Sequence, residues 1–256
     1  MADYTFIDLF APDVAHGAYN DVFGNPLLKP GSDVGVTHII MAVVAIAIIV
    51  VLALIARRKY ANKETAMIPE GKLSVRNFFE VIFDAVLNMM TGMMGKENAR
   101  RYFPLIAALS VFILIGNLMG LVPGLAPPTS NLNTSLACSV VVFVTYNIAG
   151  FRAHGIGYIK HFLGPIWFIA PLMLVIELIG HAFRPISLGV RLGGNMTGDH
   201  MVVGMFGELA TGLLGIPFLL PVPFLFLGLL VSVIQTLVFC LLTTIYISLA
   251  VSHDSH

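Results

Sequence analysis

The sequence predicts an all-α polytopic membrane protein with five transmembrane helices and one amphipathic interfacial helix. Of its 256 residues, 57% are hydrophobic and only 11% are charged, and the mean hydropathy is +0.90. A soluble domain carries about a quarter charged residues. Five apolar stretches are each long enough to cross a hydrocarbon core of about 30 Å. The formal net charge is zero, which excludes a strongly basic nucleic-acid-binding protein.

The N-terminal segment, 1–37, is predicted to be external. It is acidic, with Lys29 as its one basic residue, and it lacks the basic start and apolar core of a signal peptide. The first transmembrane helix is predicted over 38–56 and stops at Arg57. Most of the 14 Lys and Arg residues lie between Arg57 and Arg101, so the positive-inside rule places the 57–103 loop in the cytoplasm.

An amphipathic helix is predicted within this loop, over 75–94. The segment is mostly apolar, but one polar stripe recurs at spacings of three and four, at Asn77, Glu80, Asp84 and Asn88. Such a helix is expected to lie along the cytoplasmic membrane surface. The methionines at its end are interpreted as an adaptable packing surface and not as a metal site.

A transmembrane hairpin is predicted over 104–151, with spans at 104–122 and 135–151 joined by an external loop. Arg152 and Lys160 then mark a second cytoplasmic loop, 152–165, as the alternation of sides requires. Cys138 and Cys240 both lie in apolar segments, so they are interpreted as small core residues and not as a disulfide or a metal pair.

The last region, 166–256, holds two apolar stretches, 167–214 and 221–251, that are too long for a perpendicular crossing. Both are therefore predicted to be tilted. At about 100° per residue, the polar residues of the first stretch lie within roughly −40° to +80° of Arg191. They are Glu177, His181, Arg184, Ser187, Asn195 and Asp199. The second stretch has a further polar face, made of Ser232, Gln235, Phe239, Thr243 and Tyr246.

Arg191 is the most informative residue of these two faces. Insertion scales put the cost of an arginine at a helix centre at roughly 2.5 to 3.5 kcal/mol, and its guanidinium cannot lose its proton. A permanent cation in the middle of a row of titratable groups opposes a continuous proton wire by Coulomb repulsion. The pattern therefore predicts two separate half-paths for protons, one on each side of Arg191.

Simpler interpretations of single residues remain open. Ser232 or Thr243 alone can serve helix–helix packing. Arg184 precedes a proline and can sit at a kink or pair with Glu177. Glu177 and His181 have metal-ligand spacing, but no third or fourth ligand follows at a convincing spacing, so no metal is expected.

Two other function classes are also considered. An ion-coupled secondary transporter would place charges near the membrane midplane, but such proteins usually show an internal repeat, and the two halves of this chain share no duplicated pattern. An intramembrane hydrolase needs a nucleophile with a base in reach, and Ser187 has no convincing histidine partner.

The run RPISLGVRLGGN at 184–195, with Glu177 upstream, resembles the signature of the a subunit of F-type ATP synthases. The resemblance extends to 117–123, to 128–134 and to 235–250. It implies a non-catalytic stator subunit whose last two helices form a long tilted hairpin. It also implies a multi-pass location in a bacterial plasma (inner) membrane, a cytoplasmic C-terminus and no cofactor. The implied partners are the c-subunit ring, the b-subunit peripheral stalk, the other synthase subunits and the lipid bilayer.

The resemblance assigns roles by position. Arg191 matches the family's essential arginine, Asn195 and Gln235 match its polar neighbours, and Glu177 matches the acidic group of the cytoplasmic half-channel. Two positions depart from the family pattern: His200 stands where many members carry glutamate, and Gly228 stands where many carry a titratable partner. The residues expected to translocate protons are Arg191, Glu177, Asn195, Asp199, His200, Gln235 and His181. A secondary polar path is expected at Arg184, Ser187, Ser232, Thr243 and Tyr246.

Asp199 and His200 are the two candidates for the proton relay of the external half-channel. His200 is favoured over Asp199 as its proton relay, because it occupies the family's acidic position and titrates near neutral pH. On a straight helix, however, His200 points roughly 180° away from Arg191, whereas Asp199 lies at roughly +80°. Curvature or unwinding at Gly193, Gly194 and Gly198 would be needed to bring His200 onto the polar face.

Overall fold

The computed structural model describes residues 37–60, 74–122, 124–155, 157–158, 170–214 and 221–252. This part of the chain is helical and contains no strand. Its elements are α3 (Thr37–Tyr60), α5 (Val75–Met119), the 3₁₀ turn η1 (Pro128–Ser130), α6 (Leu132–His154), α8 (Ala170–Leu214) and α9 (Pro221–Val251). All five α-helices are long and apolar enough to cross a membrane. The predicted all-α polytopic fold is therefore confirmed.

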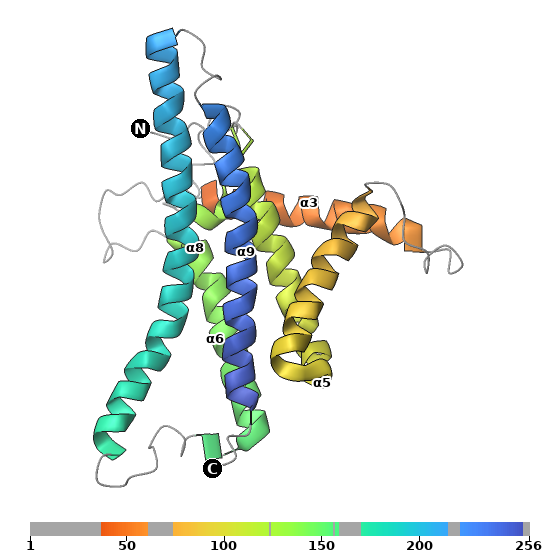
Figure 1. Cartoon of the computed structure of the whole chain (residues 1–256), viewed down its shortest axis with the longest axis vertical. Coiled ribbons are helices and arrows are strands. Elements are labelled where there is room, and N and C mark those ends of the chain that lie inside the picture. The colour runs from red at the N-terminus through yellow and green to blue at the C-terminus, as the bar shows by residue number, and fades with distance from the viewer. Residues whose placement is uncertain are drawn as a thin grey trace, which may run out of the picture.

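Helix α5 consists of two segments that meet at Gly95. The backbone there has φ +77° and ψ 164°, which is outside the helical region and which glycine adopts without a Cβ clash. The chain reverses direction at this point, so the two segments lie against each other (Figure 1). The first segment covers the residues of the predicted amphipathic helix, and the hydroxyl of Ser74 caps it by accepting from the backbone N–H of Asn77 at 3.3 Å.

Helix ends differ from the predicted spans by a few residues. Helix α3 continues through Arg57 to Tyr60, so the helix extends a turn beyond the apolar span from which it was predicted. Helix α6 begins at Leu132, three residues before the predicted span. There the side chain of Asn131 accepts from the backbone N–H of Asn133 at 2.9 Å, which satisfies a free donor of the first turn.

Helices α8 and α9 run side by side, and α3 runs across their direction (Figure 1). The 24 residues of α3 span roughly 36 Å, whereas the 45 residues of α8 span roughly 68 Å. A hydrocarbon core is only about 30 Å thick. Because α3 runs across α8, the two cannot both lie along the membrane normal, and the greater length of α8 and α9 is consistent with the predicted tilt of this pair.

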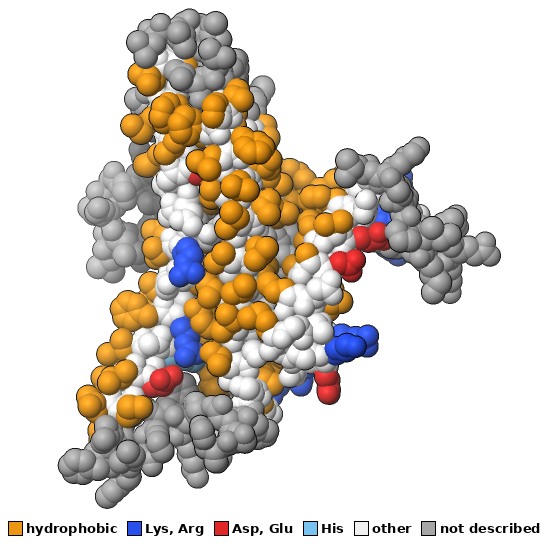
Figure 2. Space-filling model, viewed as in Figure 1, with side chains coloured by type: hydrophobic (Ala, Val, Ile, Leu, Met, Phe, Trp, Pro, Cys, Tyr) orange, Lys and Arg blue, Asp and Glu red, His pale blue; other side chains and the backbone are white. Residues whose placement is uncertain are grey.

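Two hydrophobic clusters hold the helices together. The larger one joins both segments of α5 to α6, α8 and α9. Tyr146 and Phe239 are its largest buried side chains, and it includes the buried free thiols Cys138 and Cys240. The smaller one packs α3 on α5. By contrast, the outer faces of α8 and α9 expose many large hydrophobic side chains. Figure 2 shows this apolar surface, with basic side chains over α8.

Candidate functional site

The way α8 packs on α6 determines where Arg191 lies. A Cβ atom added to Gly189 would come within 2.8 Å of Leu136, and one added to Gly193 would come within 2.8 Å of the Ser135 hydroxyl. The two glycines therefore let the helices approach closely. The residues of α8 buried along this contact are Leu188, Gly189, Leu192, Gly193 and Met196. Arg191 lies on the opposite, exposed face of α8.

No described side chain forms a hydrogen bond or an ion pair with Arg191. The exposed surface around it combines apolar Ile186 and Val190, which are 46% and 48% exposed, with the polar side chains of Ser187 and Asn195 one turn away on either side. A guanidinium that cannot lose its proton is therefore presented on an exposed surface that offers it no counter-charge. Such a group requires an anionic partner or water from beyond the described residues.

A second arginine, Arg184, is paired within the chain. Its Nη2 lies 3.6 Å from Oε1 of Glu177, and its Cζ lies 5.7 Å from the centre of the Tyr246 ring on α9. The ion pair and the cation–π contact both compensate the charge of this guanidinium. The pairing of Arg184 with Glu177, one of the interpretations that the sequence left open, is therefore present. In this respect Arg184 differs from Arg191, which has no ion pair among the described residues.

His181 is held by α6. Its Nε2 lies 2.9 Å from Oδ1 of Asn147 and 3.4 Å from the hydroxyl of Tyr146, and its side chain is buried. Because an amide oxygen only accepts, Nε2 carries the proton in the bond to Asn147. Neither of these two α6 residues was predicted from the sequence as part of the site. The available signal was Asn147, the single amide or charged side chain in the predicted span 135–151.

Asn195 and Gln235 join α8 to α9 one turn beyond Arg191. Nδ2 of Asn195 donates to Oε1 of Gln235 at 2.8 Å, and Gln235 is buried. Among the described side chains, Gln235 forms no hydrogen bond with Arg191 itself, and its oxygen accepts from Asn195.

The remaining predicted polar residues fall into two groups. The hydroxyl of Thr243 donates to the backbone of Phe239 in its own helix, and that of Ser232 is buried with no hydrogen-bond partner among the described atoms. Neither hydroxyl forms a hydrogen bond with a described residue of α8. Ser187 is exposed on α8, and the ring of Tyr246 contacts α8 at Arg184. In the described segments, no three His, Cys, Asp or Glu side chains come together as a metal site.

Asp199 lies where α8 meets Gly228 of α9. A Cβ atom at Gly228 would come 2.5 Å from Oδ2 of Asp199 and 2.9 Å from the Leu121 side chain. The missing side chain at Gly228 therefore makes the space that the Asp199 carboxyl occupies. Helix α8 is continuous past this point, without the unwinding that would turn His200 onto the face of Arg191.

Gly193→Phe is expected to disrupt the packing of α8 on α6. The ring would have to displace Ser135 and Leu132, whose atoms lie 2.8 Å and 3.2 Å from the Cβ position. We expect the amount of assembled protein in membranes to fall severalfold. Gly204→Phe is the control, because no described atom lies within 4 Å of its Cβ position. Equal yields of the two variants would contradict the close contact.

Comparison with known proteins identifies the family. Residues 39–248 match the model of the ATP synthase A chain. ATP synthase subunit a of Trichlorobacter lovleyi is 47% identical over 216 residues, which cover 84% of this chain and 87% of that protein. The corresponding protein of Geobacter sulfurreducens is 47% identical over 78% of this chain and 82% of its own length. That of Sorangium cellulosum is 43% identical, over 87% and 85%. The matched region contains every residue of the site, and the chain belongs to the ATP synthase A chain family.

Proposed function

We propose that this chain is the proton-translocating stator subunit of a rotary ATP synthase, with two offset half-channels facing a ring of c subunits. It is not itself the catalytic subunit. The observation that carries the proposal is Arg191, a cation that is exposed on α8 and has no ion pair among the described residues. A carboxylate on a passing rotor subunit is the counter-charge that this surface lacks.

Two polar groups flank Arg191 along α8 and supply the half-channels. The group of Glu177, His181 and Arg184 begins 14 residues before it, roughly 21 Å along the helix. Asp199 follows eight residues after it, roughly 12 Å along the helix. Since the basic 57–103 loop favours the cytoplasm, the first group serves the cytoplasmic half-channel and the second the external one.

Proton flow then turns the rotor. A c-ring carboxylate takes a proton from the external half-channel, becomes neutral and can face lipid. After almost a full turn it releases the proton into the cytoplasmic half-channel and passes Arg191 in the ionised state. One charge that crosses 100 mV yields about 2.3 kcal/mol, so several crossings must be accumulated for each ATP. Arg191 also blocks direct leakage between the half-channels.

The topology that accompanies this function follows from charge. The proposal places 1–37 outside a bacterial plasma membrane, 57–103 and 152–165 in the cytoplasm, and 38–56, 104–151 and most of 166–256 in the bilayer, with a cytoplasmic C-terminus. Residues 1–36 and Lys160 lie outside the described residues. The b-subunit peripheral stalk and the other synthase subunits are the expected partners.

Disulfide cross-linking tests the rotor-facing surface. Val190→Cys on α8, combined with single cysteines along the outer c-subunit helix, should give a–c cross-links in membranes. Val140→Cys is the control: it is 50% exposed on α6, close to the 48% of Val190, but lies away from Arg191. Native Cys138 and Cys240 are buried, so their background is low. Cross-links from Val140→Cys alone would place the ring on another face and overturn the proposal.

Mass spectrometry of the purified protein separates this function from the secondary transporter. Extraction in mild detergent should recover the chain with c and b subunits and with the soluble catalytic subunits. A chain recovered alone or as a homo-oligomer, from membranes in which those subunits are present, would favour the transporter.

Asp199→Ala is expected to reduce proton pumping by at least tenfold, and His200→Ala by less. The carboxyl of Asp199 lies at the α8–α9 contact beside Gly228, while His200 is one residue further round a continuous helix. ATP-driven acidification of membrane vesicles measures the effect, with assembly checked in the same membranes. Full pumping by the double variant would remove both residues from the external half-channel, and the reverse order would restore His200 as the relay.

Gly228→Ala is expected to impair pumping although it adds only a methyl group. The new Cβ would lie only 2.5 Å from Oδ2 of Asp199, so the Asp199 carboxyl would have to move. We expect a severalfold loss of pumping without loss of assembly. Gly204→Ala, on open surface of α8, is the matched control. If Gly228→Ala lowers proton pumping by the same factor in the Asp199→Ala variant as in the wild type, its effect does not act through Asp199.

A further inference from the structure

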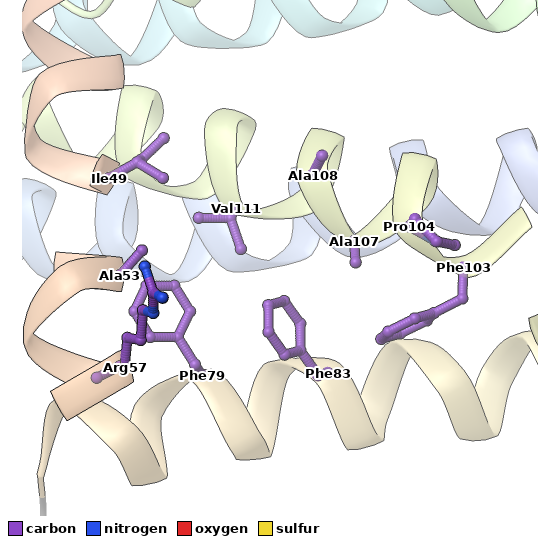
Figure 3. A pocket seen from close by; sticks show the side chains of 11 residues that line it. Ile49, Ala53, Arg57, Phe79, Phe83, Phe103, Pro104, Ala107, Ala108 and Val111 are labelled. Atoms are coloured by element: carbon purple, nitrogen blue, oxygen red, sulfur yellow. The ribbon is translucent and has the colours of Figure 1, made fainter. Parts of the chain in front are cut away.

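A cavity of about 560 Å³ lies between α3 and the two segments of α5, away from Arg191 and its flanking polar groups (Figure 3). Its size is in the range of small-molecule sites. Arg57, near the end of α3, is the one charged residue among the described residues that line it. Everything else in the lining is apolar, so the cavity combines a hydrophobic body with a single cationic group.

The sequence explains why the helices leave this space. Phe79, Phe83 and Phe103 form an aromatic wall, with ring centres 5.8 Å apart in each successive pair. Alanines at Ala53 on α3 and Ala107 on α5 stand where larger side chains would fill the volume in front of the rings. Figure 3 shows the wall extending from Arg57 at one end to Phe103 at the other.

The cavity is open to the outer surface of the protein. Among its lining residues Ala53 and Arg57 are exposed, whereas Phe79 and Val111 are buried at 6% and 4% exposure. The neighbouring outer surface is apolar as well: Leu54 next to Ala53 is 53% exposed. In a membrane-spanning helix such a surface contacts acyl chains, so a chain can enter the cavity directly from the bilayer.

Arg57 is placed to meet a lipid phosphate. Helix α3 has no Lys, Arg, Asp or Glu between Thr37 and Ala56, so Arg57 is the residue at which the apolar span ends. Within the described chain it has no ion pair, in contrast to Arg76, whose Nε lies 2.7 Å from Glu80. A planar guanidinium with free donors is well suited to bind a phosphate group.

We propose that this cavity binds an anionic phospholipid, with one acyl chain against the phenylalanine wall and the phosphate at Arg57. The opening toward lipid and the single cation in the cavity lining, at the end of the apolar span, favour this occupant over a soluble apolar molecule. The site is independent of the proposed proton path, since none of its residues belongs to α8 or α9.

Photo-labelling of the purified ATP synthase complex tests the proposal. A photoactivatable phosphatidylglycerol should label peptides of α3 and α5. Unlabelled phosphatidylglycerol should compete about fivefold better than phosphatidylcholine with the same chains, as expected for one cation near the headgroup. Arg57→Gln should make the two competitors equal. Arg58→Gln, an exposed neighbour that does not line the cavity, should preserve the preference.

A second pair of variants tests the acyl-chain site. Ala53→Phe fills the cavity from an exposed position and should abolish the labelling, whereas Val51→Phe, at a 55% exposed position outside the lining, should not. Persistent labelling in Ala53→Phe, equal competition by both lipids in the wild type, or the same loss in Arg58→Gln would each overturn the proposal. A photo-cross-linker at position 53 that captures another subunit instead of lipid would assign the cavity to a protein helix.

Discussion

Arg191→Ala is expected to abolish proton-driven ATP synthesis in complexes that remain assembled. Without the guanidinium, the ionised rotor carboxylate loses the charge that stabilises it as it passes between the half-channels. The barrier between the half-channels is lost at the same position, so a passive proton leak is also expected. Synthesis and passive proton conduction in membrane vesicles measure both effects. Assembly should be normal, because Arg191 is exposed and forms no hydrogen bond or ion pair with a described side chain.

Val190→Ala is the control for this experiment. It removes an exposed side chain next to Arg191 and should leave synthesis close to the wild-type rate. Arg191→Lys should also fail substantially, because an ammonium lacks the planar fork of guanidinium and can lose its proton when it is desolvated. Near wild-type synthesis by an assembled Arg191→Ala complex would end the assignment of this residue as the rotor-facing cation.

Most of the fold is predictable from the sequence, because the membrane converts hydrophobic length directly into helices. The segment from Thr37 to Ala56 is apolar and has no Lys, Arg, Asp or Glu, which predicts a membrane span, and α3 covers this segment. The polar stripe at 75–94 likewise indicates an interfacial helix, and its end at Gly95 matches the reversal within α5. Hydropathy carries no information about the direction of a helix: the orientation of α3 across the direction of α8 depends on tertiary packing and becomes visible only in the structure (Figure 1).

The site is predictable along α8 and much less so between helices. Helical periodicity collects Glu177 and Arg191 on one face, but it carries no information about which helix lies opposite. Asn147 therefore escaped notice, although it binds His181 from α6. Gly228 looked like a missing titratable group, whereas the structure shows that its lack of a side chain makes room for Asp199. Both findings are consequences of packing between segments distant in the sequence.

Gln235→Glu is expected to impair coupling more than Gln235→Leu, even though glutamate is closer to glutamine in shape. In the wild type, the neutral amide oxygen of Gln235 accepts from Asn195 at 2.8 Å, and Asn195 lies one helical turn from Arg191. A carboxylate would accept the same bond. It would also bring a negative charge close to Arg191 in a poorly solvated setting, where it would compete with the rotor carboxylate.

Leucine removes only the hydrogen bond, at a net cost of about 0.5 to 1.5 kcal/mol. The exposed amide of Asn195 can then bind water, and Arg191 keeps its full charge for the rotor. ATP-driven proton pumping should therefore be severalfold lower with Gln235→Glu than with Gln235→Leu. Thr243→Val is the control on the same helix, because its hydroxyl donates only to the backbone of Phe239 and should be dispensable for pumping. If Gln235 were simply a packing contact between α8 and α9, the order would reverse, because the leucine variant would lose the bond that the glutamate variant keeps.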